Sequence, residues 1–311
     1  MSRNLYMHPR NIYKDPPDYV ELAIKYPNFR AVSKLELNGK VSVNLKNPEA
    51  LKQLSKTLLL KDFQLDIEFP EKSLIPTIPL RLNYILWMED LINFFNLTKV
   101  EGIDIGCGGA AIYSILAARK NYWKMIGLEA DQENVDFATL NIKKNNLEEL
   151  VYIFQQMNDV IFKDLFELEQ NMTRKFTFCM CNPPFYEHQD NLPQNRQYRK
   201  RKAPRNEATG KFAELVCDGG EVAFVKKIIC ESLVYKDKIL IYSSLLGHKK
   251  SVFEVLQFLR TKNVENILQT EFCQGNTTRW GVAWSFSKTL DLNLCKHLCI
   301  GKPIELNVNC T

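Results

Sequence analysis

From residue 100 onward, short apolar runs alternate with longer segments in which apolar residues recur every three or four positions. Short runs of this kind are typical of buried strands, and the three-to-four spacing is typical of helices. Strands are therefore predicted over 100–105, 123–128, 151–154, 176–181 and 238–243, with helices over 110–119, 134–145, 221–234 and 252–262. Two last strands, over 266–271 and 281–286, are predicted to close as an antiparallel hairpin.

This alternation predicts an α/β fold with a Rossmann-like seven-stranded sheet. Strands that are apolar along their whole length are covered by helices on both faces, as in doubly wound sheets. The terminal antiparallel hairpin distinguishes the methyltransferase form of this sheet from dehydrogenases of similar topology. Because ligands of open α/β sheets bind outside the carboxyl ends of the strands, the site is expected in the turns that follow them.

The N-terminal region does not follow this alternation. Residues 1–47 are rich in Tyr, Lys, Arg and Pro and indicate an arm, whereas Pro48 begins a predicted helix over 48–65. Prolines then break the chain before another helix over 81–95. We therefore expect a helical N-terminal extension (1–80), a catalytic domain (81–288) and a short C-terminal tail (289–311).

Composition narrows the classes of protein. No apolar run reaches the ~20 residues that a membrane span needs, so no membrane partner is expected. The first residues, Met1 to Asn4, lead into no apolar segment, so no secretory signal is expected, and the nine cysteines are interpreted as free thiols in a reducing compartment. The net charge of +5 is concentrated, because residues 196–211 hold seven Lys/Arg and one Glu.

A glycine turn after the first predicted strand of the sheet indicates a cofactor site. The run Asp104-Ile105-Gly106-Cys107-Gly108 permits a tight turn and a close backbone approach to a ligand, and Glu129 ends the next strand. A dinucleotide would favour a third glycine at position 111, which is Ala. The pattern instead suits S-adenosylmethionine, with Glu129 accepting its ribose hydroxyls. A plain strand-to-helix turn is the alternative.

Two further residues are candidates for binding this cofactor. Asn158-Asp159-Val160 follows the third strand, where a side chain or backbone group can clamp the adenine of the cofactor. Arg81 can pair with the methionine carboxylate in a bidentate fork. An ordinary strand end and a solvated arginine at the start of a helix are the respective alternatives.

The catalytic prediction rests on Asn182-Pro183-Pro184-Phe185, which follows the very apolar run 176–181. An amine conjugated to a ring or carbonyl is a poor nucleophile, and two acceptors that hold its hydrogens favour the tetrahedral geometry that methyl transfer needs. The Asn182 side-chain oxygen and the Pro183 carbonyl are those acceptors, the prolines stiffen the loop, and Phe185 offers a face for stacking a planar target. A plain chain stop is the alternative.

The motif alone does not name the amine, which can belong to adenine in RNA or DNA or to a glutamine side chain. The basic segment directly after the motif suits a phosphate backbone and favours RNA. Its candidate RNA-binding residues are Arg199, Lys200, Arg201, Lys202 and Arg205, joined by Arg10 and Lys14 of the N-terminal arm. A protein glutamine N-methyltransferase and an RNA-binding protein that acts without catalysis remain alternatives.

Four segments together resemble the methyltransferase-like 16 family of RNA adenine-N6 methyltransferases. They are Pro79–Tyr84, Gly102–Gly106, Cys179–Phe185 and Glu271–Gly275, and the resemblance covers residues 1 to about 288. Members act on U6 small nuclear RNA and on hairpins in S-adenosylmethionine synthetase transcripts. The resemblance implies cofactor contacts at Arg81, Gly106, Glu129, Val160 and Asn182, catalysis by residues 182–185, and RNA contacts from the N-terminal arm, the 186–213 insert and the turn that contains Arg279.

The remaining expectations concern partners, location and metals. We expect U6 small nuclear RNA and messenger-RNA hairpins as partners, no DNA, and a monomer in the nucleus and cytoplasm. Because the sequence ends at Thr311, we expect no counterpart of the long C-terminal RNA-binding region of vertebrate members. Cys295, His297 and Cys299 cannot supply a tetrahedral metal site without a distant fourth ligand, so no metal is expected.

Overall fold

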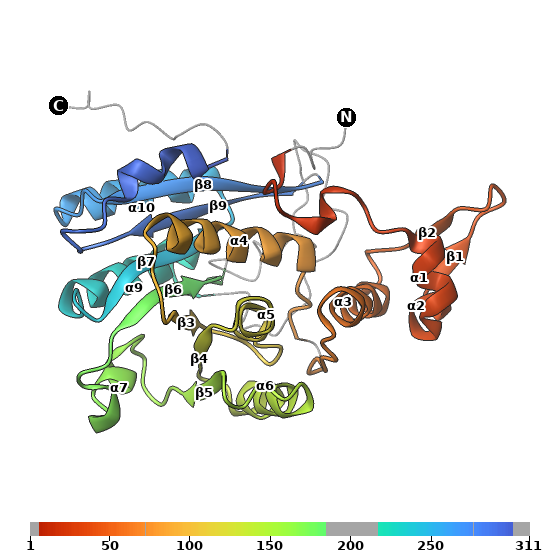
Figure 1. Ribbon diagram of the computed structural model, residues 1–311, viewed down its shortest axis with the longest axis horizontal. Coiled ribbons are helices and arrows are strands. Elements are labelled where there is room, and N and C mark those ends of the chain that lie inside the picture. The colour runs from red at the N-terminus through yellow and green to blue at the C-terminus, as the bar shows by residue number, and fades with distance from the viewer. Residues whose placement is uncertain (1–5, 72, 185–216, 276, 301–311) are drawn as a thin grey trace.

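The computed structural model describes residues 6–71, 73–184, 217–275 and 277–300. Seven strands form one sheet in the order β5-β4-β3-β6-β7-β9-β8 (Figure 1). They are β3 (Glu101–Ile105), β4 (Lys124–Glu129), β5 (Val151–Gln155), β6 (Phe176–Cys181), β7 (Ile239–Leu246), β8 (Ile267–Gln274) and β9 (Thr277–Trp284). Strands β3 to β7 are parallel, and β9 is antiparallel to both of its neighbours, so the predicted Rossmann-like sheet with its closing hairpin is confirmed.

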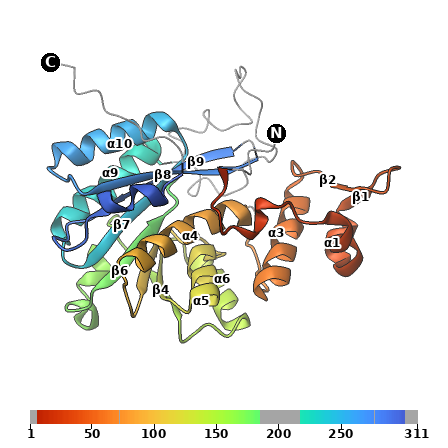
Figure 2. The same ribbon diagram turned by 45° about the horizontal axis from the view of Figure 1, so that its top comes forward.

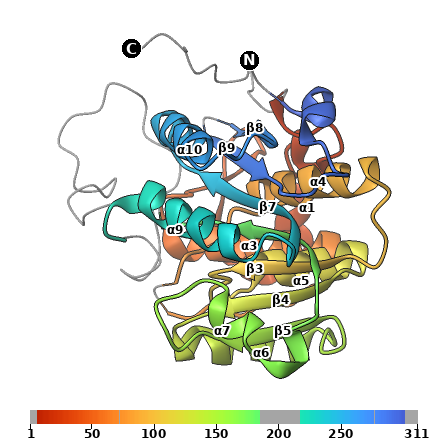
Figure 3. The same ribbon diagram turned by 90° about the vertical axis from the view of Figure 1, so that its left-hand side faces the viewer.

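Helices cover both faces of this sheet. On one face, α4 (Ile78–Phe94), α5 (Ile112–Asn121) and α6 (Gln132–Lys144) share a hydrophobic cluster with the strands. On the other face, α7 (Lys163–Phe166), α9 (Gly220–Val234) and α10 (Lys249–Thr261) share a second cluster. Figure 3 shows α9 and α10 on the opposite side of the sheet from α4 and α5. Burial from both sides explains why the central strand β6 is apolar and buried along nearly its whole length.

The N-terminal region is folded where the sequence predicted an arm. The 3₁₀ turn η2 (Ile12–Lys14), α1 (Tyr19–Lys25), α2 (Pro27–Ala31) and a hairpin of β1 (Ser33–Leu35) and β2 (Val41–Val43) precede α3 (Pro48–Phe63). The prediction of an arm is therefore wrong for residues 6–47, because elements of three to seven residues are too short to show a hydrophobic period. In both views, α1 and the hairpin project from one end of the molecule (Figure 1, Figure 2).

The N-terminal extension and the described part of the tail both pack on the catalytic domain. One hydrophobic cluster runs from Met7 and Leu22 through α4 and α5 to Leu292 and Cys295. Those last two residues belong to the 3₁₀ turn η6 (Leu292–Leu298), which lies against β8 and α4. The predicted boundaries at 80 and 288 therefore fall inside one shared core. No helix in the described ranges is long and apolar enough to span a bilayer.

Candidate active site

A cavity opens at the carboxyl ends of β3, β4 and β6. It is bounded by the glycine turn after β3, by the end of β4, by the chain after β6, by the start of α4 and by residues of the N-terminal extension. Its lining includes Arg81, Gly106, Glu129, Asn182, Pro183 and Pro184, together with Ser73, Leu74, Pro76, Asn134, Gln156 and Phe224. The fold thus brings most of the predicted cofactor and catalytic residues to one cavity, as the rule for parallel sheets requires.

The glycine turn shapes one wall of this cavity. Gly106 has a φ of +65°, a left-handed conformation that side chains disfavour, and no atom lies within 4 Å of the place where its Cβ would be. Gly109 is needed for the opposite reason, because a Cβ there would lie 2.5 Å from Pro70 Cγ. One glycine leaves room for a ligand, and the other lets the N-terminal extension pack against the turn.

Glu129 is fixed at the end of β4 by backbone N–H groups. Its Oε2 accepts from Gly108 N at 2.8 Å, and its Oε1 accepts from Ala130 N and Asp131 N at 2.9 Å each. A carboxylate offers roughly four lone-pair sites, so three such bonds leave about one for a ligand hydroxyl. The carboxylate is therefore held rigidly in the cavity wall, with capacity for one more strong hydrogen bond.

Arg81 lies in the first turn of α4, with only 7% of its surface exposed. Its guanidinium donates from Nη1 to the Tyr113 hydroxyl at 2.9 Å and lies over the same ring. Its Nε has no hydrogen-bond partner among the described residues, although it is buried. An unpaired buried donor is costly, so this atom fits a bound acceptor such as a carboxylate.

Asp104 lies below the glycine turn and is almost fully buried. Burial raises the pKa of its carboxyl to about 7, against the opposing effects of the Ser114 hydrogen bonds and the charge of Arg81. Its Oδ2 accepts from both Ser114 N and Ser114 Oγ, at 3.1 Å and 3.0 Å. Because Ser114 belongs to the first turn of α5, Asp104 ties β3 to the helix that the glycine turn opens.

The catalytic loop follows directly from β6. Asn182 and Pro184 are half-buried, Pro183 is buried, and Asn182 Oδ1 is a buried acceptor without a partner among the described residues. This is the acceptor that the sequence assigned to the target amine. Phe185, the fourth residue of the predicted motif, lies outside the described residues.

Val160 does not line the cavity among the described residues. Its carbonyl accepts from the Gln156 side chain at 2.8 Å, and Gln156 itself lies in the lining. The next two backbone N–H groups, of Ile161 and Phe162, donate to Glu231 of α9 at 2.7 Å each. Gln156 is therefore the residue after β5 that lines the cavity among the described residues, and a cofactor contact at Val160 stays a prediction.

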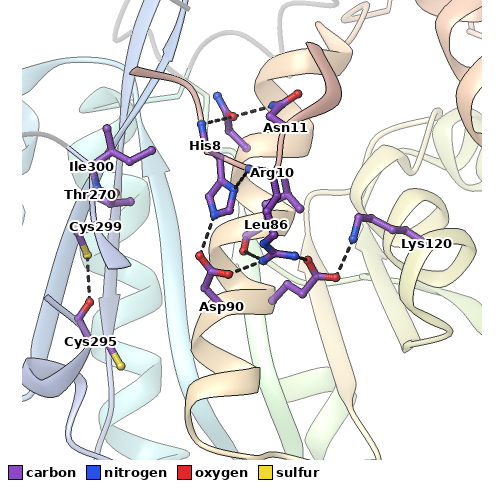
Figure 4. Close-up of polar contacts among 12 residues, drawn as sticks. His8, Arg10, Asn11, Leu86, Asp90, Lys120, Thr270, Cys295, Cys299 and Ile300 are labelled. Carbon is purple, nitrogen blue, oxygen red and sulfur yellow. Dashed lines mark hydrogen bonds and ion pairs between the residues drawn. The ribbon is translucent and has the colours of Figure 1, made fainter. Parts of the chain in front are cut away.

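Among the predicted RNA-binding residues, Arg10 takes part in a compact polar network on α4 (Figure 4). Its guanidinium pairs with Glu89 and Asp90, and 45% of the side chain is exposed. His8 donates from Nε2 to Asp90 at 2.8 Å while its Nδ1 accepts from Arg10 N at 3.3 Å. Lys120 of α5 completes the network by donating to Glu89 at 2.7 Å. An RNA contact by Arg10 stays a prediction beside this structural role.

The other predicted RNA-binding residues divide into two groups. Lys14 is exposed at the end of η2, and Arg279 lies half-buried in β9, where it donates to the Thr278 carbonyl at 3.0 Å. The residues of the basic insert lie outside the described residues, namely Arg199, Lys200, Arg201, Lys202 and Arg205. Their contacts with RNA stay predictions.

Sequence reasoning missed Gln156 and three further residues of the cavity. Asn134 of α6 is 2% exposed and its Oδ1 has no partner among the described residues. Phe224 comes from α9, across the sheet, and Leu74 comes from the N-terminal extension. The sequence held no local signal for them, because each reaches the cavity only through tertiary packing. Among the described residues, no cluster of three His, Cys, Asp or Glu could hold a metal ion.

Comparison with known proteins gives consistent matches. The profile of a family described as RNA methyltransferase matches residues 1–288. The U6 small nuclear RNA (adenine-(43)-N(6))-methyltransferase of Drosophila pseudoobscura pseudoobscura is 50% identical over 293 residues, covering 93% of this chain and 96% of that protein. Human RNA N(6)-adenosine-methyltransferase METTL16 is 42% identical over 291 residues, covering 92% of this chain and 51% of that protein.

Solved structures agree. The hMettl16 catalytic domain in complex with a MAT2A 3′UTR hairpin superposes with a TM-score of 0.83 at 41% identity, covering 91% of this chain and 96% of that one. The N-terminal domain of human METTL16 in complex with S-adenosylhomocysteine (SAH) superposes with a TM-score of 0.76 at 40% identity, covering 91% and 99%.

Proposed function

Since the chain belongs to the RNA methyltransferase family whose profile matches residues 1–288, we propose that it methylates an adenine of U6 small nuclear RNA at N6. It is an S-adenosylmethionine-dependent methyltransferase. The observation that carries the proposal is a set of three buried polar atoms without partners among the described residues, Arg81 Nε, Asn134 Oδ1 and Asn182 Oδ1, in the lining of a single cavity. Arg81 Nε fits the carboxylate of the cofactor, and Asn182 Oδ1 fits the target amine.

The residues present fit the cofactor. S-adenosylmethionine, when bound, supplies an electrophilic methyl group. The Arg81 guanidinium would hold its carboxylate, Glu129 would accept from its ribose, and the open side of Gly106 leaves room for its approach. Tyr113 keeps the guanidinium in place by accepting from Nη1, so less side-chain freedom is lost when the cofactor binds.

The catalytic loop acts on the amine. The nitrogen lone pair of adenine N6 is delocalised into the ring, so the flat amine must become tetrahedral before it can attack. Asn182 Oδ1 and the Pro183 carbonyl accept its two hydrogens and favour that geometry, and the two prolines restrict the loop. Asn182 Oδ1 has no hydrogen-bond partner among the described residues, which matches the role of an acceptor that binds a substrate amine.

RNA is the proposed macromolecular partner. The named Drosophila relative acts on U6 small nuclear RNA, and the hMettl16 structure contains a MAT2A hairpin. We propose U6 small nuclear RNA first and hairpins of S-adenosylmethionine synthetase transcripts second, with no DNA or membrane partner. The protein is further proposed to be a monomer in the nucleus and cytoplasm, with the basic insert at 196–211 contacting phosphates.

The test is transfer of labelled methyl groups to three acceptors: a U6 hairpin, the same hairpin with the target adenine changed to guanine, and a glutamine-containing peptide. Label in the first RNA alone, released as N6-methyladenosine, is the expected result. Label in the peptide would point to a glutamine methyltransferase. Tight RNA binding without any label would point to a protein that acts without catalysis. Mapping methylated adenosines in total RNA with and without the protein would then identify its targets.

A further inference from the structure

The sheet is incompletely paired at the point where β6 leads into Asn182. On one side, β3 pairs with β6 as far as Ile105 and Cys181. On the other side, within the described part of the chain, pairing between β6 and β7 ends at Phe178 and Ile241. Residues 179–181 therefore approach the catalytic loop without a paired register to β7.

Two buried side-chain hydroxyl groups connect the strands beyond that point. Ser243 of β7 donates from Oγ to the Cys179 carbonyl at 2.7 Å. The Tyr84 hydroxyl of α4 lies 2.8 Å from the same Oγ, and Cys181 N–H donates to Tyr84 at 3.4 Å, the longest of the three bonds. Neither Tyr84 nor Ser243 is exposed to solvent.

The hydroxyl protons of Ser243 and Tyr84 can be assigned in one way only. Ser243 has a single hydroxyl proton, and the Cys179 carbonyl takes it at a strong distance, in preference to the weaker Met88 sulfur acceptor 3.5 Å away. The Tyr84 proton therefore goes to Ser243 Oγ, and the Tyr84 oxygen accepts from Cys181 N–H. Burial raises the pKa of Tyr84 well above its usual value, so the phenol keeps that proton. The relay leaves β6 at Cys181 and returns to it at Cys179.

We propose that Tyr84 and Ser243 are positioning residues for methyl transfer, whose hydroxyl relay replaces the missing β6–β7 register and fixes the backbone that carries Asn182. Cys181 is bonded directly to Asn182, so a shift of its amide moves both acceptors of the loop. The inference rests on the proposed role of Asn182 and adds the buried groups that aim it.

The same tyrosine also touches the cofactor wall. Its ring meets the Tyr113 ring edge to face at a centroid distance of 5.4 Å, and the Tyr113 hydroxyl accepts from Arg81. One aromatic ring therefore supports the arginine on one side and the catalytic loop on the other. Replacing Tyr84 with Phe keeps the ring contact and removes only the relay, which separates the two effects.

The test compares Tyr84→Phe and Ser243→Ala with a matched control, Tyr242→Phe. Tyr242 is the neighbour of Ser243 on β7 and is equally buried, but it belongs to the hydrophobic cluster of the other face. Its hydroxyl donates to the Tyr235 carbonyl at 2.5 Å, and its ring stacks on Trp284. The control loses a tyrosine hydroxyl bond whose acceptor lies outside β6 and keeps the packing of the ring.

The expected result is a split between rate and affinity. Tyr84→Phe and Ser243→Ala lower the single-turnover rate on the order of tenfold to a hundredfold, because small misplacements of reacting groups have effects of that size. Affinities for SAH and for RNA stay unchanged. The double variant is less impaired than the product of the single effects, since both act through one relay. Tyr242→Phe keeps the wild-type rate.

Hydrogen exchange supplies a readout that does not depend on activity. Backbone amides from Cys179 to Asn182 exchange faster in Tyr84→Phe and Ser243→Ala than in wild type or Tyr242→Phe. The proposal is overturned if Tyr84→Phe keeps both the wild-type rate and the wild-type exchange, or if Tyr242→Phe loses as much rate. If the wild type methylates no RNA, the proposed function fails, whereas the exchange measurement still decides whether the relay orders the loop.

Discussion

Helix α4 serves two polar regions that are built in opposite ways. At its start, Arg81 faces the cavity with a buried Nε that lacks a partner among the described residues, as does Asn182 Oδ1. Near its end, His8, Arg10 and Asp90 satisfy one another through three hydrogen bonds. Both regions are rich in polar groups at helix surfaces. The sequence predicted a ligand contact for an arginine in each region, with the cofactor for Arg81 and with RNA for Arg10.

The difference points to the cavity as the region that takes a ligand, because three buried polar atoms without partners among the described residues, Arg81 Nε, Asn134 Oδ1 and Asn182 Oδ1, lie in its lining. A buried polar group without a partner costs about 1–3 kcal/mol, so a fold tolerates it where a substrate supplies the missing bond. A saturated network needs no ligand and holds the N-terminal segment in place. The pKa of a carboxyl group is also shifted in opposite directions in the two regions. Although burial opposes it, hydrogen bonds from His8 and Arg10 lower the pKa of Asp90, whereas burial dominates at Asp104 and raises its pKa.

The sharpest way to break this comparison is to remove the unpaired acceptor. Asn182→Ala should lower the single-turnover rate by roughly 10²–10³, because one lost acceptor of the transition state has an effect of that size. Affinity for SAH should fall only slightly. Asn134→Ala, which removes the other orphaned amide oxygen of the cavity, is the comparison variant. An Asn182→Ala enzyme that keeps more than a tenth of the rate would remove Asn182 from the mechanism.

Asp104 tests the electrostatic side of the comparison. Its folded-state pKa of about 7 lies above its usual value of 3.8, so the folded protein holds the proton more tightly than the unfolded chain. The resulting stability is present at pH 4 and is lost as the pH rises through 7, by up to roughly 4 kcal/mol. Asp104→Asn should flatten this part of the pH profile of urea unfolding.

Asp90→Asn is the control with the opposite sign. The pKa of Asp90 is lowered, so its contribution to stability is present at neutral pH and is lost on acidification. Two results together would contradict a raised pKa for Asp104. They are a wild-type free energy of unfolding that rises between pH 4 and 7, and an Asp104→Asn variant with the same slope.

Glu129 gives the next effect in size, on cofactor affinity. Glu129→Ala should weaken binding of SAH about tenfold or more, since a charge-assisted hydrogen bond contributes about 1.5–3 kcal/mol. Glu133→Gln, at an exposed carboxylate in the first turn of α6, should leave affinity unchanged. Calorimetry on the two variants measures both. Equal affinities would mean that the ribose is held elsewhere.

The smallest expected effect is on the free energy of unfolding, from a substitution of Arg10 in the network that it forms with His8 and Asp90. Its side chain is 45% exposed, so solvent screens its ion pairs, and Arg10→Ala should lower the free energy of unfolding by about 1 kcal/mol or less. Affinity for SAH should not change. RNA affinity, measured on the same variant beside Lys143→Ala at an exposed lysine of α6, tells whether Arg10 also contacts RNA. A loss of cofactor binding in Arg10→Ala would show that the two regions are coupled through α4.

These regions also show what the sequence could and could not predict. The strands, the glycine turn and Asn182 were predictable because hydrophobic period and motif spacing are local properties of the chain. Gln156, Asn134 and Phe224 were not, because they meet in the cavity from a loop and two helices that are far apart in the sequence. The pairing of Arg10 with Glu89 and Asp90 joins residues about 80 positions apart, which no local pattern encodes.

Helix α4 has little freedom to change its length. Arg81 points to the cavity, Asn83 donates to the Cys273 carbonyl, Tyr84 meets β7, and Asp90 holds His8. One inserted residue would rotate the rest of the helix by roughly 100° and shift it by about 1.5 Å. The contacts before the insertion and those after it could then not be kept at the same time. Insertions and deletions during divergence should therefore gather in connections such as 146–150 and leave α4 at constant length.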